Sequence, residues 1–476
     1  MDPYLKIIRD IALHTNKRRL IALLLFLSIA VLIINTVDLE RNTGARNQEC
    51  RDCNVILIAI DTLRADHLGV FGYSRNTSPN IDAFAQDARI FENFYSNAPW
   101  TLPSFSTMFT SLYPRDSRMQ LPSDRLDDKF TTIAEILQQN GYTTVGFNSP
   151  SPLSEEQGFF QGFDSFTVVE PDGRKQDTTL IVPKALDWLN TNKNTKFFMF
   201  LHTFEVHDPF CPPGDFDKFR DNYSGTLDCI DITTISEHNR GEEVLSSPDL
   251  ERLVSLYDGD ILHTDYNLGK LFDQLKAEGL YGNTIVIVTA DHGEEFGERE
   301  LIGHAYTLHS ELVHVPLLIR APNFSPGIEH SSASTIDISP TILDLLGIPI
   351  PSYFKGRPLT QFDGSRIIYQ ETSAPIELVR QLDRIIASTQ QGQIEVRQSD
   401  LPAYKESMIY SNWKYIVDSA NSRTELYDLN SDPREERNLI GINQPQEQTL
   451  KDLYISFRRN EGANTATAAP VQLTPP

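Results

Sequence analysis

The sequence predicts an α/β fold in which a mostly parallel central sheet is flanked by helices. Residues 54–60 and 284–289 are apolar runs without alternation, which is typical of strands buried on both faces of a parallel sheet. Segments with the apolar spacing of helices lie between such runs, which indicates crossover connections between parallel strands. After residue 356 the runs become short and are separated by polar loops, which predicts a small antiparallel C-terminal subdomain.

Local signals place the expected elements in chain order. Thr132 and Glu135 have the spacing of a capping box, and Gly141 would end the helix that they begin. Residues 250–278 predict a long amphipathic helix, because apolar side chains recur at helical spacing until Gly279. Four more helices are expected: one beginning at Ser78-Pro79, one spanning 103–112, one ending at Trp188-Leu189 and one beginning at Ser339-Pro340. Further strands are expected over 142–147, 196–201, 313–319, 366–370, 414–417 and 425–429.

Charge and composition limit the class of protein. The chain has 476 residues and a formal net charge of −23, and a protein with this charge repels phosphate backbones, so a nucleic-acid partner is excluded. The apolar content is that of a globular protein, and the length predicts about two to three domains. Residues 211–247 are rich in Pro, Gly, Asp and Ser and are expected to form a long loop.

The N-terminus has the pattern of a membrane anchor. Basic residues in segment 1–19 precede segment 20–37, which has no charged residue and is nearly long enough to span a bilayer. The basic flank predicts a cytoplasmic N-terminus, and no small-residue cleavage site stands clearly after the apolar stretch. A retained signal anchor is therefore favoured over a cleaved signal peptide, and the remainder is expected in the periplasm, the extracellular space or an organelle lumen.

The cysteines fit an oxidising compartment. Cys50 and Cys53 lie close together, as do Cys211 and Cys229, so two local disulfides are the simplest pairing. A redox-active Cys-Arg-Asp-Cys motif is the alternative for the first pair, although the motif precedes a strand rather than a helix.

Polar residues follow the two buried strands directly. Asp61 ends the first run, and Asp291 and His292 end the second. Ligands bind beyond the carboxyl ends of strands in open α/β sheets, and a carboxylate beside an imidazole is a candidate pair of metal ligands. Ordinary turn chemistry is the alternative.

A hydroxyl group is expected at the start of a helix near the carboxyl ends of these strands. Pro103 suits a first helical turn, so Thr101 would lie just before a helix N-terminus, where free N–H groups favour an anion. Its hydroxyl could there attack a phosphorus or sulfur centre. The alternative is that Thr101 only caps the helix.

These motifs together resemble the sulfatase family of the alkaline phosphatase superfamily, in the family's order from about residue 54 to 440. The matching segments are Asp61-Thr62-Leu63-Arg64-Ala65-Asp66, Gly72-Tyr73, Ser78-Pro79-Asn80-Ile81-Asp82, Thr101-Leu102-Pro103-Ser104, Leu112-Tyr113-Pro114, Tyr257-Asp258-Gly259 with Asp265, Thr289-Ala290-Asp291-His292-Gly293, Val315-Pro316-Leu317, Asp337-Ile338-Ser339-Pro340-Thr341 and Glu425-Leu426-Tyr427-Asp428-Leu429 with Asp432-Pro433. The resemblance implies an alkaline-phosphatase-like fold.

The resemblance also implies roles for single residues. It makes Asp61, Asp291 and His292 metal ligands and puts Thr101, beside the metal, at the nucleophile position. His207 matches a histidine that contacts the transferring group or its leaving oxygen. His304 falls near the position of a lysine or histidine that binds the anionic oxygens.

The chain departs from sulfatases at the nucleophile. Sulfatases have a cysteine or serine, which is oxidised to formylglycine, and an arginine four residues later, where this chain has Thr101 and Phe105. Threonine cannot be converted to the aldehyde, and its ester cannot release sulfate by elimination. Water would have to attack the covalent intermediate directly, which favours phosphoryl chemistry or transfer to an acceptor alcohol.

The set of metal ligands departs from that of sulfatases as well. Thr62 stands where many sulfatases have a second aspartate, which leaves few hard ligands for calcium, so zinc or manganese is favoured. His202, His207 and His304 could hold a second metal. As alternatives, His202 could contact substrate or bond within the core, and Arg64 could contact substrate or pair with Asp66 or Asp61.

The expected function is metal-dependent hydrolysis of sulfate or phosphate esters by a metal-bound Thr101, with His207 or His304 protonating the leaving oxygen. The alternatives are a membrane-anchored phosphotransferase that modifies a lipid or glycan, and a catalytically silent relative that binds anionic glycans or a partner protein. The expected segments are a cytoplasmic end (1–19), an anchor (20–37), a stalk (38–53), a catalytic domain (54–355), a C-terminal subdomain (356–459) and a disordered tail (460–476). The sequence does not define the oligomeric state or the physiological substrate.

Overall fold

A computed structural model describes residues 50–170, 177–220, 223–361, 366–373, 404–419 and 421–460. The expected membrane anchor at 20–37, the segments beside it at 1–19 and 38–49, and the end of the tail from residue 461 lie outside the described residues. Among the helices that are described, none combines the length and apolar character that crossing a bilayer requires.

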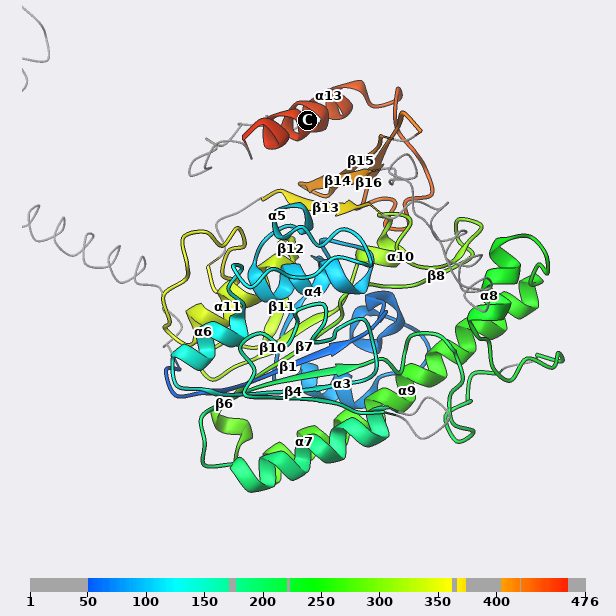
Figure 1. Ribbon diagram of the computed structural model, residues 1–476. Helices are drawn as coiled ribbons and strands as arrows, with labels where there is room; N and C mark the ends of the chain where they lie inside the picture. Colours follow the sequence, from blue (N-terminus) through cyan, green and yellow to red (C-terminus); the bar gives the residue numbers. More distant parts are fainter. Residues whose placement is uncertain are drawn as a thin grey trace, which may run out of the picture. The chain divides into compact units, whose positions relative to one another are not determined.

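An eight-stranded sheet forms the centre of the body that begins at Cys50 (Figure 1). Every neighbouring pair is parallel except the two pairs made by β10, which runs against β7 and β2. The sheet order is β11 (Gly327–Glu329), β2 (Arg89–Phe91), β10 (Leu317–Arg320), β7 (Thr284–Thr289), β1 (Asn54–Ile60), β6 (Phe197–Thr203), β4 (Thr143–Asn148) and β5 (Ser165–Val168). The predicted α/β fold with a mostly parallel sheet is confirmed.

The two runs that predicted the sheet are its central strands. β1 lies between β6 and β7, and Ala59 pairs with His202 on one side and with Thr289 on the other. All residues of β1 and β7 are buried, as the unbroken apolar runs predicted. The strand predicted over 313–319 is shorter, because Pro316 has no N–H for the ladder and Ser310–Val313 forms a helical turn instead.

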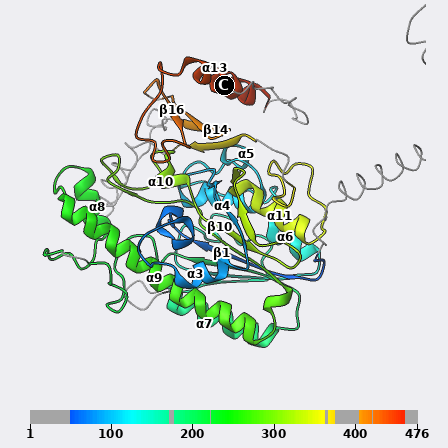
Figure 2. The ribbon, with the colours of Figure 1, turned by 180° about the vertical axis from the view of Figure 1, so that it is seen from behind.

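Helices cover both faces of the sheet (Figures 1 and 2). Helices α3, α7 and α9 lie on one face, and α4, α6 and α11 lie on the other. The predicted capping box of α6 is present, since Thr132 and Glu135 exchange both hydrogen bonds. The α-helices are α3 (Pro79–Ala85), α4 (Thr101–Thr110), α5 (Pro114–Ser117), α6 (Ile133–Gln139), α7 (Thr178–Asn192), α8 (Ile232–Asn239), α9 (Ser247–Ala277), α10 (Ser310–Val313), α11 (Ile338–Leu345) and α13 (Gln444–Asn460).

Shorter elements connect these layers. The 3-10 turns span Ala65–His67, Gly69–Phe71, Tyr281–Asn283 and Thr335–Asp337. Two small sheets pair β3 (Phe94–Tyr95) with β12 (Ala333–Ser334) and β8 (Glu295–Phe296) with β9 (Ile302–Gly303). The stretch expected as a loop over 211–247 also contains α8.

The C-terminal part forms a separate antiparallel sheet, as predicted. Its strands lie in the order β13 (Ile368–Thr372), β14 (Lys405–Tyr410), β15 (Trp413–Asp418) and β16 (Arg423–Asp428). Helix α13 packs on this sheet through Leu450, Leu453 and Tyr454. Neither β14 nor α13 is among the predicted elements, although the apolar spacing of α13 is helical.

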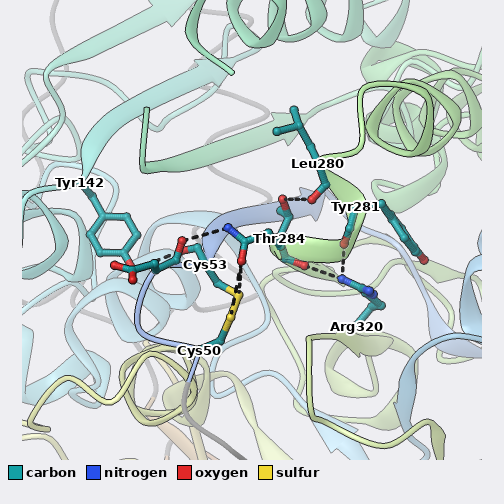
Figure 3. The surroundings of a disulfide bond; sticks show 9 residues. Cys50, Cys53, Tyr142, Leu280, Tyr281, Thr284 and Arg320 are labelled. Carbon is teal, nitrogen blue, oxygen red and sulfur yellow. Dashed lines mark hydrogen bonds between the residues drawn. A yellow bond between two sulfur atoms is a disulfide. The ribbon is translucent and has the colours of Figure 1, made fainter. Parts of the chain in front are cut away.

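Both cysteine pairs are bonded, Cys50 with Cys53 and Cys211 with Cys229, which confirms the local pairing. The first disulfide lies where β1 begins, and the Tyr142 hydroxyl donates to the carbonyl of Cys53 at 3.1 Å (Figure 3). This disulfide therefore lies at the amino end of β1, whereas Asp61 follows the carboxyl end of the same strand.

Candidate active site

Two buried aspartates lie side by side at the carboxyl edge of the sheet. Ala59 of β1 pairs with Thr289 of β7, and each residue is two positions before an aspartate, Asp61 or Asp291. Both carboxylates are fully buried. The backbone N–H of Asp61 donates to the Thr203 carbonyl at 2.9 Å, and Oδ1 of Asp291 accepts from the backbone N–H of Thr62 at 3.3 Å. The parallel register thus brings together the two residues that the strand ends suggested.

His292 directs one ring nitrogen at both carboxylates. Its Nδ1 lies 2.9 Å from the Gly293 carbonyl, which can only accept, so Nδ1 carries the proton. Its Nε2 lies 3.3 Å from Oδ2 of Asp291 and 3.6 Å from Oδ1 of Asp61. Burial, together with the charge of nearby His304, lowers the pKa of His292 to about 3, so the ring is neutral and Nε2 presents a lone pair.

His202, from β6, makes a second contact of the same kind. Its Nδ1 lies 2.5 Å from Oδ1 of Asn148, and its Nε2 lies 3.1 Å from Oδ2 of Asp61. The Asn148 amide donates to the Leu153 carbonyl at 3.0 Å, which fixes its oxygen toward His202. The sequence left open whether His202 contacts substrate or bonds within the core. In the structure His202 is fully buried against Asp61 and lies in the carboxylate cluster.

The cluster fits a divalent cation. Oδ1 of Asp61 and Oδ2 of Asp291 are buried and accept no hydrogen bond from any described residue. Ligand atoms of Asp61, His202 and Asp291 all lie within 4.8 Å of one another. Burial and the charge of Asp61 raise the pKa of Asp291, whereas for Asp61 burial is outweighed by the hydrogen bond from His202 and by the charges of nearby histidines, which lower its pKa. A cation would compensate the two carboxylate oxygens, one on each aspartate, that accept no hydrogen bond from the described residues.

Thr101 lies inside α4 and faces this cluster. Trp100 occupies the N-cap position and Thr101 is the first helical residue, so the alternative that Thr101 is only the cap does not hold. The Thr101 hydroxyl lies 3.3 Å from Nε2 of His292. The helix is held to the strand end by Ser104, whose hydroxyl donates to the Asp291 carbonyl at 2.7 Å.

Two further histidines lie on the more open side of the cluster. The ring centroid of His304 is 4.5 Å from that of His292 and 5.0 Å from that of His207. The His207 and His304 side chains are 14% and 20% exposed, so they are more accessible than the carboxylates. Nδ1 of His304 lies 3.3 Å from both oxygens of the buried Glu294 carboxylate.

Arg64 does not fit the expected substrate contact. Its guanidinium pairs with both oxygens of Asp66, each at 2.9 Å, and its Nη1 lies 2.6 Å from Glu298. Only 7% of its side chain is exposed. Arg64 therefore stabilises the turn after β1 instead of presenting a cation to an anionic ester, which is the alternative that the sequence left open.

Two supporting residues are missing from the sequence prediction. Asn148 is the last residue of β4, so the rule that located Asp61, a polar side chain at the end of a parallel strand, could have indicated it. Glu294 lies two residues after His292, and nothing in its spacing distinguishes it from its neighbour Glu295. Only the folded chain shows which of the two glutamates reaches His304.

This fold and this site are those of a sulfatase-like ester hydrolase. A family model described as Sulfatase matches residues 53–348, which is more than half of the chain, so the protein belongs to the sulfatase family. The antiparallel C-terminal sheet lies after the matched segment.

Known proteins are similar to the chain over most of its length. Human arylsulfatase K is 24% identical over 463 residues, which cover 88% of this chain and 84% of that protein. The N-acetylglucosamine-6-O-sulfatase of Bacteroides thetaiotaomicron is 22% identical over 505 residues and 87% of each chain. The crystal structure of the phosphonate monoester hydrolase of Agrobacterium radiobacter superposes with a TM-score of 0.70 at 19% identity, covering 87% of this chain and 96% of that one, a likeness that concerns the fold.

Proposed function

We propose that this protein hydrolyses a phosphate or sulfate ester with the Thr101 hydroxyl as nucleophile. One observation carries the proposal: the hydroxyl lies 3.3 Å from Nε2 of His292, within the buried cluster that contains Asp61 and Asp291. A hydroxyl beside two carboxylates, each with one oxygen that accepts no hydrogen bond from the described residues, is the arrangement expected of a metal-assisted nucleophile.

Four side chains would hold the metal, namely Asp61, Asp291, His202 and His292. Two imidazole nitrogens in the set favour zinc or manganese over calcium, which prefers oxygen ligands. When bound, such a cation would lower the pKa of the Thr101 hydroxyl and neutralise charge on the transferring group.

The remaining steps follow from the chain's own groups. Thr101 would attack the phosphorus or sulfur in line, forming one ester bond as the bond to the leaving oxygen breaks. The backbone N–H groups of Thr101 and Leu102, the first two residues of α4, would stabilise the equatorial oxygens. His304, whose Nδ1 faces Glu294, could donate a proton from Nε2 to the leaving oxygen, and His207 is the alternative donor. Water would then release the product from Thr101.

We favour a phosphate ester over a sulfate ester. Threonine has no route to the formylglycine aldehyde of sulfatases, so the covalent intermediate must be opened by direct attack, which phosphoryl esters permit. Several relatives are named as sulfatases of sugars and one structural neighbour is a phosphonate monoester hydrolase, which supports an anionic ester carried on a glycan as the substrate class. The alternatives are an ester carried on a lipid as the substrate, and transfer of the phospho-group to an acceptor alcohol instead of water.

Turnover of three test esters examines the proposal. The full chain, purified in detergent, would be assayed with aryl phosphate, aryl phosphodiester and aryl sulfate, with and without zinc or manganese. Thr101→Ala should lower kcat by at least about 10³-fold. Thr107→Ala is the matched control, because Thr107 lies on the same helix and its hydroxyl bonds only to the Pro103 carbonyl. Added glycerol would distinguish hydrolysis from transfer by the ratio of products.

The contrary result is equally specific. If the wild-type protein turns over none of the three esters, and Thr101→Ala binds sulfated or phosphorylated glycans as well as the wild type does, the silent binding protein becomes the better account.

The proposed location is outside the cytoplasm, with residues 20–37 as the anchor. The two disulfides support this, because such bonds persist in oxidising compartments. In sealed membrane vesicles of known orientation, protease should digest the body only from the extracytoplasmic side. Digestion from the cytoplasmic side would contradict the proposal.

A further inference from the structure

The motif Tyr257-Asp258-Gly259 on α9 has no part in the chemistry above. Tyr257 is fully buried, and its hydroxyl makes two hydrogen bonds to the turn that follows Asp61. The hydroxyl donates to the Thr62 carbonyl at 2.8 Å and accepts from the Arg64 N–H at 2.9 Å. One side-chain group from a distant helix thus bridges two backbone groups next to the candidate site.

The turn that Tyr257 holds has an unusual backbone conformation. Thr62 has φ of 54°, in the left-handed region that β-branched residues rarely adopt. Such a conformation persists only where its surroundings impose it. The same residue links the two aspartates, since its N–H donates to Oδ1 of Asp291 at 3.3 Å and its hydroxyl donates to the Asp61 carbonyl at 2.8 Å.

We infer that Tyr257 is a positioning residue for the Asp61 and Asp291 carboxylates. Its hydroxyl keeps Thr62 in the left-handed conformation, and that conformation aims the Thr62 N–H at Asp291. Oδ1 of Asp291 thus accepts from Thr62 at 3.3 Å in addition to the His292 backbone N–H at 2.9 Å, which leaves Oδ2 directed at the cluster and without a hydrogen bond from the described residues. The inference rests on the proposed function in that this cluster holds a metal.

Helix α9 is itself held firmly against this turn. Asp258 is fully buried and accepts from the Tyr73 hydroxyl at 2.7 Å and from Arg75 at 2.8 Å. A Cβ atom at Gly259 would lie 2.7 Å from Pro212, so glycine permits the close approach of the Cys211–Cys229 loop. The Tyr257 hydroxyl is therefore presented by a fixed element, as positioning requires.

Core packing is the alternative role for Tyr257. Its ring centroid lies 4.7 Å from that of Phe296 and 5.1 Å from that of His67. A phenylalanine would keep these ring contacts and lose only the hydroxyl. Tyr257→Phe therefore separates the two roles.

Metal affinity of the full chain is the decisive measurement. It would be obtained by competition with a chromophoric zinc chelator for the wild type, Tyr257→Phe, Asp61→Asn and the matched control Tyr142→Phe. Tyr142 is also a buried tyrosine with a hydrogen bond to a backbone carbonyl, but it lies at the opposite edge of the sheet. Tyr257→Phe should weaken zinc binding by about 10- to 100-fold and lower kcat with little change in KM, whereas Tyr142→Phe should change neither.

A second variant covers the case in which Tyr257→Phe does not fold. Glycine adopts positive φ without strain, so in a Thr62→Gly background the change Tyr257→Phe should alter zinc affinity by less than about threefold. If Tyr257→Phe binds zinc as tightly as the wild type while Asp61→Asn has lost zinc binding, the positioning role of Tyr257 is overturned and the metal cluster of the proposed function stands. Equal, weak binding by the wild type and Asp61→Asn overturns both the positioning role and the metal cluster of the proposed function.

Discussion

Nε2 of His202 lies 3.1 Å from Oδ2 of Asp61, and both side chains are fully buried. Nδ1 of His202 lies 2.5 Å from the side-chain oxygen of Asn148, which leaves Nε2 as the ring atom directed at Asp61. Ligand atoms of His202, Asp61 and Asp291 lie within 4.8 Å of one another. This arrangement makes His202, on β6, a candidate metal ligand.

His202→Gln should therefore weaken metal binding. We expect a loss of zinc or manganese affinity of at least about tenfold, because a candidate ligand that Asn148 orients is removed. His263→Gln is the matched control, since His263 is also buried and bonded to a carboxylate, Glu205, but lies outside the cluster. Metal content after dialysis and chelator competition measure the effect. Unchanged affinity in His202→Gln would exclude His202 as a ligand.

Ser104→Ala should reduce activity by misplacing Thr101. The Ser104 hydroxyl joins α4 to the Asp291 carbonyl at 2.7 Å, one helical turn after Thr101. A small displacement of a reacting group is costly, so we expect kcat to fall by about 10- to 100-fold. In the control Ser106→Ala, the lost bond is the one from the Ser106 hydroxyl to the Ser117 hydroxyl at the end of α5, and kcat should stay within about twofold. Equal kcat values in the two variants would contradict the role of Ser104.

Phe105→Arg should destabilise the fold instead of restoring a sulfatase feature. Sulfatases have an arginine at this position, but here the Phe105 ring is fully buried, 4.9 Å from the His202 ring and 5.7 Å from the Phe200 ring between centroids. An unpaired guanidinium among aromatic rings would cost ~3 kcal/mol or more, whereas Phe105→Leu should cost about 1–2 kcal/mol. The denaturant concentration at the midpoint of unfolding would compare the stability of Phe105→Arg with that of Phe105→Leu. Equal stability would mean that the site accommodates a cation.

The sequence predicted most of the framework because its strongest signals are local. Unbroken apolar runs located β1 and β7, and the polarity change at their ends located Asp61 and Asp291. The capping box located α6. In the C-terminal part, α13 was missed although Leu450, Leu453, Tyr454 and Phe457 have helical spacing, because the segment is otherwise polar and lies beside the tail.

Pairings across the chain could not be predicted in the same way. His202 meets Asp61 because β6 pairs with β1 in one particular register, and the composition of either strand does not specify that register. Tyr257 reaches Thr62 across 195 residues of sequence. Arg64 could have faced either substrate or carboxylates, and only the folded positions of Asp66 and Glu298 decide it.

A last prediction concerns pH and Glu295. This side chain is fully buried, and its Oε2 accepts no hydrogen bond from the described residues. Burial, followed by the charges of Glu311 and Glu298, raises the pKa of Glu295 from its ordinary value of 4.5 to about 8. The folded state thus binds more protons than the unfolded state between these values, so this group lowers the stability of the protein as pH rises through that window.

Glu295→Gln should remove this pH dependence. The amide cannot ionise, so we expect the variant to match the wild type near pH 5 and to exceed its free energy of unfolding by about 1–3 kcal/mol near pH 8. Denaturant unfolding of the full chain at several pH values would measure the difference, with the exposed Glu300→Gln as control. Parallel stability curves for the wild type and Glu295→Gln would contradict this prediction. They would show that Glu295 stays ionised in the fold, where the backbone N–H of Arg299 donates to its Oε1 at 2.7 Å.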